Sequence, residues 1–258
     1  MLTELIKGFK NRRIWIFLSL LEIKNRYVGS FIGPFWITIS QIVLVFSIGY
    51  IYGGIFNIPP ETYMPFLTCG FCCWNLINGT LNEGTKCFSG HKEFLNELSI
   101  NPITFVYKVV CSNLIIFFHN FFSIFFIFYL TKYPYSPIFL LFIIGVFFIL
   151  INGILVVTTL ATLSERFRDI PSLVTNIMQI GFFVTPIIWD PISFKSRAII
   201  ILKLNPFWYF VSAARDPLLG RMPEISTYLI LIVITIINFF IARYVYKKYS
   251  KRIIYWMQ

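Results

Sequence analysis

Six long apolar segments dominate the sequence and restrict the folds that it can adopt. A helix needs about 20 apolar residues to cross the hydrocarbon core of a bilayer. Hydrophobic residues make up 57% of the 258 residues and charged residues only 13%, whereas soluble domains carry about 25% charged residues. The sequence therefore predicts an integral membrane protein. The segments cover about residues 32–56, 65–86, 103–130, 138–163, 172–189 and 225–245.

None of these segments alternates polar and apolar residues as a strand would. Backbone polar groups in lipid must be satisfied within the chain, and a helix achieves this by itself. We therefore expect an all-α integral membrane fold of six transmembrane helices that forms a single domain over residues 1–258. The second segment is the least apolar, because it carries Asn75, Asn78, Asn82 and Glu83.

Two regions outside these segments are also expected to contact the membrane. In residues 3–26, Leu5, Phe9 and Trp15 alternate with lysines and arginines, which is typical of an amphipathic helix at the interface. The connection 190–224 is too apolar for a solvated loop and is interrupted by two X-Pro pairs, at 205–206 and 216–217. It fits a re-entrant helical hairpin in the outer leaflet or, equally, a pair of interfacial helices.

The distribution of basic residues predicts the orientation. The chain has 22 Lys and Arg against 11 Asp and Glu, a net charge of +11. With both termini in the cytoplasm, fifteen basic residues lie inside and six outside, as the positive-inside rule requires. The basic residues are not gathered in one aqueous domain. We therefore expect a multi-pass protein that contacts anionic membrane lipids and no nucleic acid.

Groups that carry catalysis or ion coupling are scarce. The sequence has two histidines, and among its carboxylates only Glu83 lies within an apolar segment, whereas ion-coupled carriers need ionisable groups at membrane depth. Residues 79–86 resemble a phosphate-binding loop, but its last two residues are reversed and no strand precedes it. The cysteines, including Cys69-x-x-Cys72, are expected to be small packing residues. The sequence thus indicates a transporter that takes its energy from a partner.

Uncharged polar and aromatic side chains recur at helical spacing in three segments. Such stripes either join helices in lipid or line a hydrated path, and neutral amides, hydroxyls and rings suit sugars better than ions. The second segment contributes Phe71, Asn75, Asn78, Asn82 and Thr85. Our candidates for a substrate path are Trp36, Ser40, Ser47 and Tyr50 in the first segment and Asn176, Gln179 and Phe183 in the fifth.

A series of short motifs follows the chain in order. They are Arg26-Tyr27-x-x-Ser30-x-x-Gly33-x-x-Trp36, Gly70-x-x-x-Trp74-Asn75, Leu81-Asn82-Glu83-Gly84, Arg168-Asp169-Ile170, Thr185-Pro186-Ile187, Asn205-Pro206-Phe207 and Arg215-Asp216-Pro217-Leu218. By these motifs the chain resembles the permease subunits of bacterial ATP-binding-cassette exporters for polysaccharide and polyol phosphate, which move O antigens, capsules and teichoic acids. The likeness covers nearly the whole chain, although Asn101-Pro102 departs from the aromatic-Pro pair that is frequent in the family.

The resemblance implies a homodimer in the bacterial inner membrane, docked on two copies of a separate ATPase subunit that binds ATP and Mg. The permease itself would then hold no cofactor and no catalytic or metal site. Its cargo would be an undecaprenyl-pyrophosphate-linked glycan, with O antigen favoured over capsule or teichoic acid. A small-lipid or drug exporter is one alternative, and a membrane-embedded lipid-modifying enzyme, which would need an acid/base or metal cluster, is another.

Two cytoplasmic sites follow from this interpretation. Lys24, Arg26 and Tyr27 stand at the inner mouth of the first segment, where the planar donor fork of arginine suits pyrophosphate oxygens. Plain anchoring to anionic lipid explains the same residues equally well. A short polar helix within residues 87–101 is the candidate docking element for the ATPase. Its candidate coupling residues are His91, Lys92, Glu93 and Glu97.

Overall fold

The computed structural model describes residues 1–97, 100–190 and 202–256, and every regular element in these ranges is helical. The helical fold class is therefore confirmed. The elements are α1 (Leu2–Lys10), α2 (Arg12–Arg26), α3 (Phe35–Phe56), α4 (Pro60–Thr85), η1 (Ser89–His91), α5 (Lys92–Glu97), α6 (Ile103–Thr131), η2 (Pro137–Leu141), α7 (Phe142–Ser164), α8 (Ile170–Val184), α10 (Pro206–Leu218), α11 (Ile225–Tyr249), η4 (Ser250–Arg252) and α12 (Ile253–Trp256).

Four helical stretches are long and apolar enough to cross a membrane. They are α3, α6, η2 together with α7, and α11. α8 is apolar but has only 15 residues, a length of about 22 Å at 1.5 Å per residue. α4 has 26 residues but carries the polar stripe. The structure thus gives four candidate spans, and α4 and α8 are the two elements that the predicted six would add.

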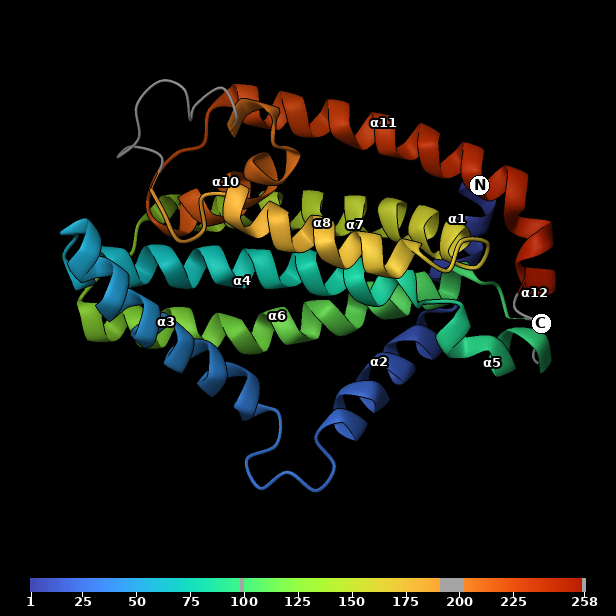
Figure 1. The fold of residues 1–258 in the computed structure, drawn as a ribbon, viewed down its shortest axis with the longest axis horizontal. Coiled ribbons are helices and arrows are strands. Elements are labelled where there is room, and N and C mark those ends of the chain that lie inside the picture. The colour runs from blue at the N-terminus through green and yellow to red at the C-terminus, as the bar shows by residue number, and fades with distance from the viewer. Residues whose placement is uncertain (98–99, 191–201, 257–258) are drawn as a thin grey trace.

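α4 lies in the middle of the bundle (Figure 1) and packs against α3, α6, α7, α8 and α10. Its residues from Phe66 to Trp74 are all buried. Cys69, Cys72 and Cys73 are fully buried free thiols, which confirms their predicted role as small packing residues. Because other helices surround α4, its polar residues do not have to face lipid.

The N-terminal region forms two helices where the sequence predicted one. α1 and α2 meet at Asn11, whose side-chain amide donates to the Thr104 hydroxyl of α6 at 3.0 Å. Close beside this joint, Gly8 packs against Ile103 so tightly that a Cβ there would lie 2.8 Å from the Ile103 side chain. The two contacts hold the joint against the start of α6, and the chain changes direction there.

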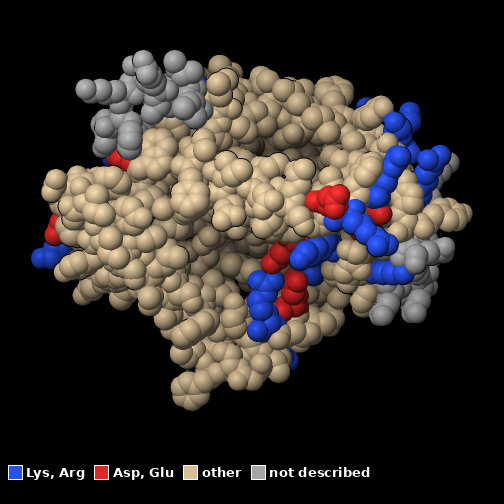
Figure 2. Space-filling view, viewed as in Figure 1, with Lys and Arg blue, Asp and Glu red and all other residues tan. Residues whose placement is uncertain are grey.

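The two ends of the molecule differ in charge. α1, α5 and α12 all lie at one end of the bundle (Figure 1). Figure 2 shows Lys and Arg side chains gathered at that same end. The first and last described helices therefore lie together on the basic side of the molecule.

The predicted hairpin 190–224 is described only in part, because residues 191–201 lie outside the described structure. Asn205-Pro206 begins α10 as expected, with the Asn205 side chain accepting from the Phe207 amide at 3.0 Å in a typical N-cap. Asp216-Pro217 lies at the other end of α10, which stops at Leu218, one residue after the proline. Pro217 lies in the last turn, so only the end of the hydrogen-bond ladder is disturbed.

Arg215 fixes α10 to the rest of the bundle. Its side chain is 3% exposed, lies 4.5 Å from the ring centre of Phe66 in α4, and pairs with Asp216 at 3.1 Å. It also donates to the backbone carbonyl of Pro186, just after α8. One buried cation thus connects α4, α8 and α10.

The close approach of α7 to α10 gives a stability prediction. A Cβ on Gly145 would overlap the backbone of Ala213 and Ala214, and backbone cannot move aside as a side-chain tip can. Gly145→Ala should therefore destabilise the protein by about 1–3 kcal/mol, as overpacking does. Thermal unfolding of the purified protein in detergent measures the effect.

Gly54→Ala is the matched control, because a Cβ there would meet nothing within 4 Å. Alanine is a better helix former than glycine, so this variant should unfold at the wild-type temperature or slightly above it. Equal unfolding temperatures for Gly145→Ala and Gly54→Ala would contradict the proposed contact.

Candidate functional site

α4 exposes a single polar face. Between Phe66 and Thr85 the residues that are not buried are Asn75, Asn78, Gly79, Leu81, Asn82 and Glu83. Apart from Leu81, these positions recur every three to four residues and so lie on one side of the helix. Of the five predicted stripe residues, Phe71 and Thr85 are buried, while the three asparagines form the accessible face.

The asparagines of this face also bind the neighbouring helices. Asn75 donates to Gln41 of α3 at 3.4 Å, and Gln41 in turn donates to Ser123 of α6 at 2.8 Å. On the other side, Thr175 of α8 donates to Asn82 at 2.8 Å. Asn82 also donates to the side-chain oxygen of Asn78 at 2.8 Å. The stripe therefore joins α4 to its neighbours and is linked along its own face.

The predicted path residues all lie on exposed faces of α3 and α8. Trp36 is 53%, Tyr50 76% and Phe183 65% exposed, and Ser40, Ser47, Asn176 and Gln179 are exposed as well. α3 and α8 each pack on α4 with other residues. Within the described chain, the structure therefore leaves these seven side chains open to lipid or to another chain.

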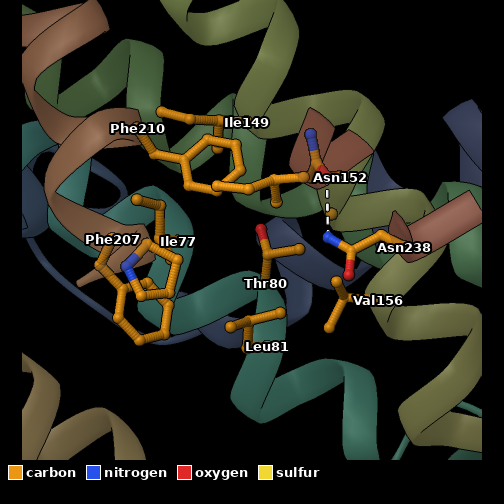
Figure 3. A pocket seen from close by; sticks show the side chains of 12 residues that line it. Ile77, Thr80, Leu81, Ile149, Asn152, Val156, Phe207, Phe210 and Asn238 are labelled. Carbon is orange, nitrogen blue, oxygen red and sulfur yellow. Dashed lines mark hydrogen bonds between the residues drawn. The ribbon is translucent and has the colours of Figure 1, made fainter. Parts of the chain in front are cut away.

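A separate cavity of 240 Å³ lies between α4, α7, α10 and α11. Figure 3 shows Ile77, Ile149, Phe207 and Phe210 around it, with Thr80 among them. Its amides bind one another. Asn238 donates to Asn152 at 2.9 Å, drawn as the dashed line in Figure 3, and Asn152 donates to Thr235 at 2.8 Å.

This cavity is poorly suited to a glycan. Its walls are mainly aliphatic and aromatic, and the amides that reach it are already used to join α7 to α11. Sugar hydroxyls would enter it without hydrogen-bond partners, which is unfavourable for a polar ligand. The accessible polar face of α4 is the better candidate for contact with sugars.

Charged residues from three helices meet at the inner part of this face. Lys108 of α6 is 5% exposed, and its Nζ lies 2.8 Å from Oε2 of Glu22 in α2. Arg26 of α2 donates to Oε1 of Glu83 in α4 at 2.9 Å and lies 3.8 Å from Glu22. Figure 2 shows acidic and basic side chains together in the region where α2 meets α4.

Hydrogen bonds from α6 complete the network. Ser112 donates to Glu22 at 2.7 Å, and Asn113 donates to Oε2 of Glu83 at 2.7 Å. Burial alone would raise the pKa of Glu22, but the hydrogen bonds from Lys108 and Ser112 and the charges of Lys108 and Arg26 outweigh it and lower that pKa. Ionised Glu22 therefore stabilises the folded protein at pH values above its ordinary pKa of 4.5, and this stabilisation is lost as the pH falls through the lowered pKa.

A groove of about 650 Å³ opens beside this network. α2 contributes Glu22 and Arg26 to it, the end of α4 contributes Glu83, and α6 contributes Lys108. Lys86 and His91 line it from the segment that follows α4. We call this the charged groove.

Only part of the predicted headgroup site lies in the charged groove. Arg26 lines it, whereas Lys24 is exposed elsewhere on α2 and Tyr27 is half-buried outside it. Sequence reasoning missed Glu22 and Lys108. The signal was present, because Lys108 is an ionisable residue within an apolar segment, and such residues are usually paired and functional.

The predicted coupling residues are described unevenly. The His91 ring stacks on Phe105 with centres 4.6 Å apart, and its Nδ1 donates to the Cys87 carbonyl at 2.8 Å. Burial lowers its pKa, so the ring stays neutral. Lys92 is exposed, while the side chains of Glu93 and Glu97 lie outside the described residues, although α5 includes both. His91 thus anchors this segment rather than offering a free surface.

Comparison with known proteins identifies the architecture. Residues 15–219 match the family described as ABC-2 type transporter. The chain belongs to the ABC-2 type transporter family. It is similar to the O-antigen export system permease protein RfbA of Myxococcus xanthus, with 25% identity over 206 residues that cover 77% of each chain. The protein is thus a multi-pass membrane permease, a transport subunit, as the sequence motifs indicated.

The matched range contains the features that matter for transport. It runs from within α2 to just past α10, so it includes the polar face of α4 and every residue of the charged groove. α1 and α11 lie outside it. The permease therefore carries its candidate site within the part that defines the family.

The buried pair under α2 gives a second prediction. Lys108→Met keeps the length of the side chain but leaves Glu22 without its nearest cation, and breaking a buried pair costs about 3–5 kcal/mol. The loss should be at the low end of that range because the Glu22 side chain is 31% exposed. Chemical unfolding of the purified permease measures it.

Lys24→Met is the control, since Lys24 is exposed on the same α2 helix. It should change the free energy of unfolding by less than about 0.5 kcal/mol, as most surface substitutions do. If both variants unfold alike, the Lys108–Glu22 pair does not hold α2 to the bundle.

Proposed function

We propose that this permease is the transmembrane subunit of an ATP-driven exporter that moves an undecaprenyl-pyrophosphate-linked polysaccharide, O antigen in the first instance, across the bacterial inner membrane. The observation that carries the proposal is the row of three asparagines on the accessible face of α4, within a chain of the ABC-2 type transporter family. Asparagine amides exchange hydrogen bonds with sugar hydroxyls and hold no fixed charge against a neutral chain. The choice of O antigen rests on the relative from Myxococcus xanthus, which bears that name.

The proposed topology has six spans, formed by α3, α4, α6, α7, α8 and α11, with both termini in the cytoplasm. α4 qualifies because surrounding helices bury most of its length and its accessible polar residues lie on one face. α8 is short for a core about 30 Å thick, but the chain continues beyond it through the buried residues 185–187. α10 would form the returning arm of a re-entrant hairpin on the periplasmic side, and α1 with α2 the interface helices.

The proposed assembly is a homodimer on two ATPase subunits, which would bind the ATP and Mg. The exposed polar and aromatic side chains of α3 and α8 support a second protomer on this side, because serines and amides are poor lipid-facing residues. η1 and α5 support ATPase docking. They project at the basic end of the bundle (Figure 1) between α4 and α6, so they would transmit movement directly to the polar helix.

Within the dimer, the channel would be lined by the seven path residues: Trp36, Ser40, Ser47, Tyr50, Asn176, Gln179 and Phe183. Aromatic faces contact the apolar faces of sugar rings, and hydroxyls and amides bond to sugar hydroxyls. Many weak and repeated contacts allow a long chain to slide. Capsule, teichoic acid or a smaller lipid remain alternative cargoes, and their export would use the same path.

Deletion of the gene in its host tests the function. The long-chain surface glycan should disappear while its lipid-linked form accumulates inside the cell, and a plasmid copy should restore export. The glycan that is lost decides between O antigen, capsule and teichoic acid. Retention of every surface glycan together with retention of a small lipid or drug in the cytoplasm would reject polysaccharide export.

Ser47→Trp tests the path in the complemented strain. Ser47 is exposed on α3, and its hydroxyl bonds only to the Val43 carbonyl within its own helix, at 2.8 Å, among the described contacts. A tryptophan there should narrow the proposed channel and lower glycan export at least about tenfold, the loss expected when a transition state is raised by about 1.4 kcal/mol. Surface glycan per unit of permease is the measurement.

Val233→Trp is the matched control. Val233 is 54% exposed on α11, which packs mainly on α7 and α10, and a lipid-facing position accepts tryptophan. This variant should export at the wild-type rate. Full export by Ser47→Trp would assign this face of α3 to lipid and remove it from the path.

A further inference from the structure

In the charged groove, a carboxylate of the protein itself occupies the position at which an external anion would bind. Arg26 is accessible, with 37% of its side chain exposed, yet Oε1 of Glu83 already occupies its guanidinium at 2.9 Å. Carboxylate and phosphate oxygens compete for the same donor fork of an arginine. An entering phosphate group therefore meets an arginine that is present but held by Glu83.

Glu83 can release Arg26 without losing all of its partners. Its second oxygen accepts from Asn113 of α6 at 2.7 Å, and Asn113 also donates to the Val109 carbonyl at 3.0 Å. Releasing Arg26 costs Glu83 only one of these two contacts, because the hydrogen bond from Asn113 stays in place. The Arg26–Glu83 pair is thus an exchangeable contact, whereas the buried Lys108–Glu22 pair beside it is fixed.

The groove also holds positive charge beyond these two pairs. Its lining contains Arg26, Lys86 and Lys108 against Glu22 and Glu83, so one cation remains in excess when His91 is neutral. Lys86 is exposed at the C-terminus of α4, one turn from Glu83. A flexible ammonium beside a planar guanidinium is a suitable pair of donors for a phosphate with several oxygens.

The position of the groove suits a ligand held in the membrane. Its outer wall is the amphipathic α2, and just beyond Arg26 the chain enters residues 27–34, where Val28 is 72% and Phe31 fully exposed. Gly29 and Gly33 adopt positive φ angles of 80° and 63°, and a Cβ on either would contact nothing within 4 Å. Figure 1 shows this connection joining the end of α2 to the start of α3.

We propose that the charged groove binds the phosphate group of a lipid headgroup through Arg26 and Lys86, and that Glu83 is the internal anion that holds Arg26 until the phosphate displaces it. The assignment of the ligand to the export substrate rests on the proposed function. This exchange couples binding of the substrate to movement of α2 relative to α4, because displacing Glu83 breaks the ion pair between these two helices.

Binding is measured apart from export. The full-length permease in phosphatidylcholine nanodiscs is titrated with farnesyl pyrophosphate, and the same titration is repeated with inorganic pyrophosphate and with phosphatidylglycerol in place of it. Glu83→Gln keeps the shape of the side chain and its contact with Asn113 but weakens the hold on Arg26. It should lower the Kd for farnesyl pyrophosphate about fivefold, the scale of a half-exposed ion pair.

Lys86→Gln should raise the Kd for farnesyl pyrophosphate about fivefold by the same argument. The double variant Glu83→Gln with Arg26→Gln should lose the gain in affinity that Glu83→Gln alone produces. Two controls are matched in charge. Glu61→Gln lies at the start of α4 and Lys247→Gln in the last turn of α11 at the basic end. Both should keep the wild-type Kd, and thermal unfolding of every variant confirms that it is folded.

The outcomes separate the claims. Glu83→Gln and Lys86→Gln with wild-type Kd values overturn the site, whatever the cargo is. Equal affinity and the same mutant pattern for phosphatidylglycerol support the phosphate site but assign it to membrane lipid. Tighter binding of farnesyl pyrophosphate supports its link to the substrate. Retention of polysaccharide export after deletion of the gene, together with an intact binding pattern, would fault the proposed function alone.

Discussion

The structure depends on keeping one polar helix out of contact with lipid. α4 carries three asparagines and two glutamates, and each unsatisfied polar group in hydrocarbon is costly. Surrounding helices bury most of its length and leave one polar face accessible. That arrangement explains why the fold is a bundle around α4 rather than a flat array of hairpins, and why its accessible face is the natural place for a polar cargo.

The second constraint lies where α2 meets the bundle. An amphipathic helix at the interface is usually held by lipid, but α2 is also tied to α6 by the Lys108–Glu22 pair and to α4 by the Arg26–Glu83 pair. One of these contacts is buried and the other accessible. The helix is therefore both anchored and able to respond to what enters the charged groove.

Much of the architecture could be predicted because hydropathy and breaker residues act locally. The apolar segments became α3, α4, α6, α7, α8 and α11, and Asn205-Pro206 begins α10 as expected. α10 also ends directly after Asp216-Pro217, at Leu218. The break at Asn11 was not predictable in this way, because Asn11 is held by a tertiary contact, its hydrogen bond to Thr104. For the site, sequence pointed to Arg26 and the asparagines, but only the fold brings Glu22 and Lys108 together, 86 positions apart.

The setting of Arg215 has a consequence for the order of assembly during synthesis. Its partners are Phe66 in α4, the Pro186 carbonyl after α8, and its own neighbour Asp216. A cation at this depth is unfavourable until such partners surround it. α4 and α8 precede α10 in the chain, so the partners of Arg215 are already made when α10 leaves the ribosome, and α10 can dock on them as it emerges. A chain truncated before α10 would leave Phe66 and the Pro186 carbonyl without this cation.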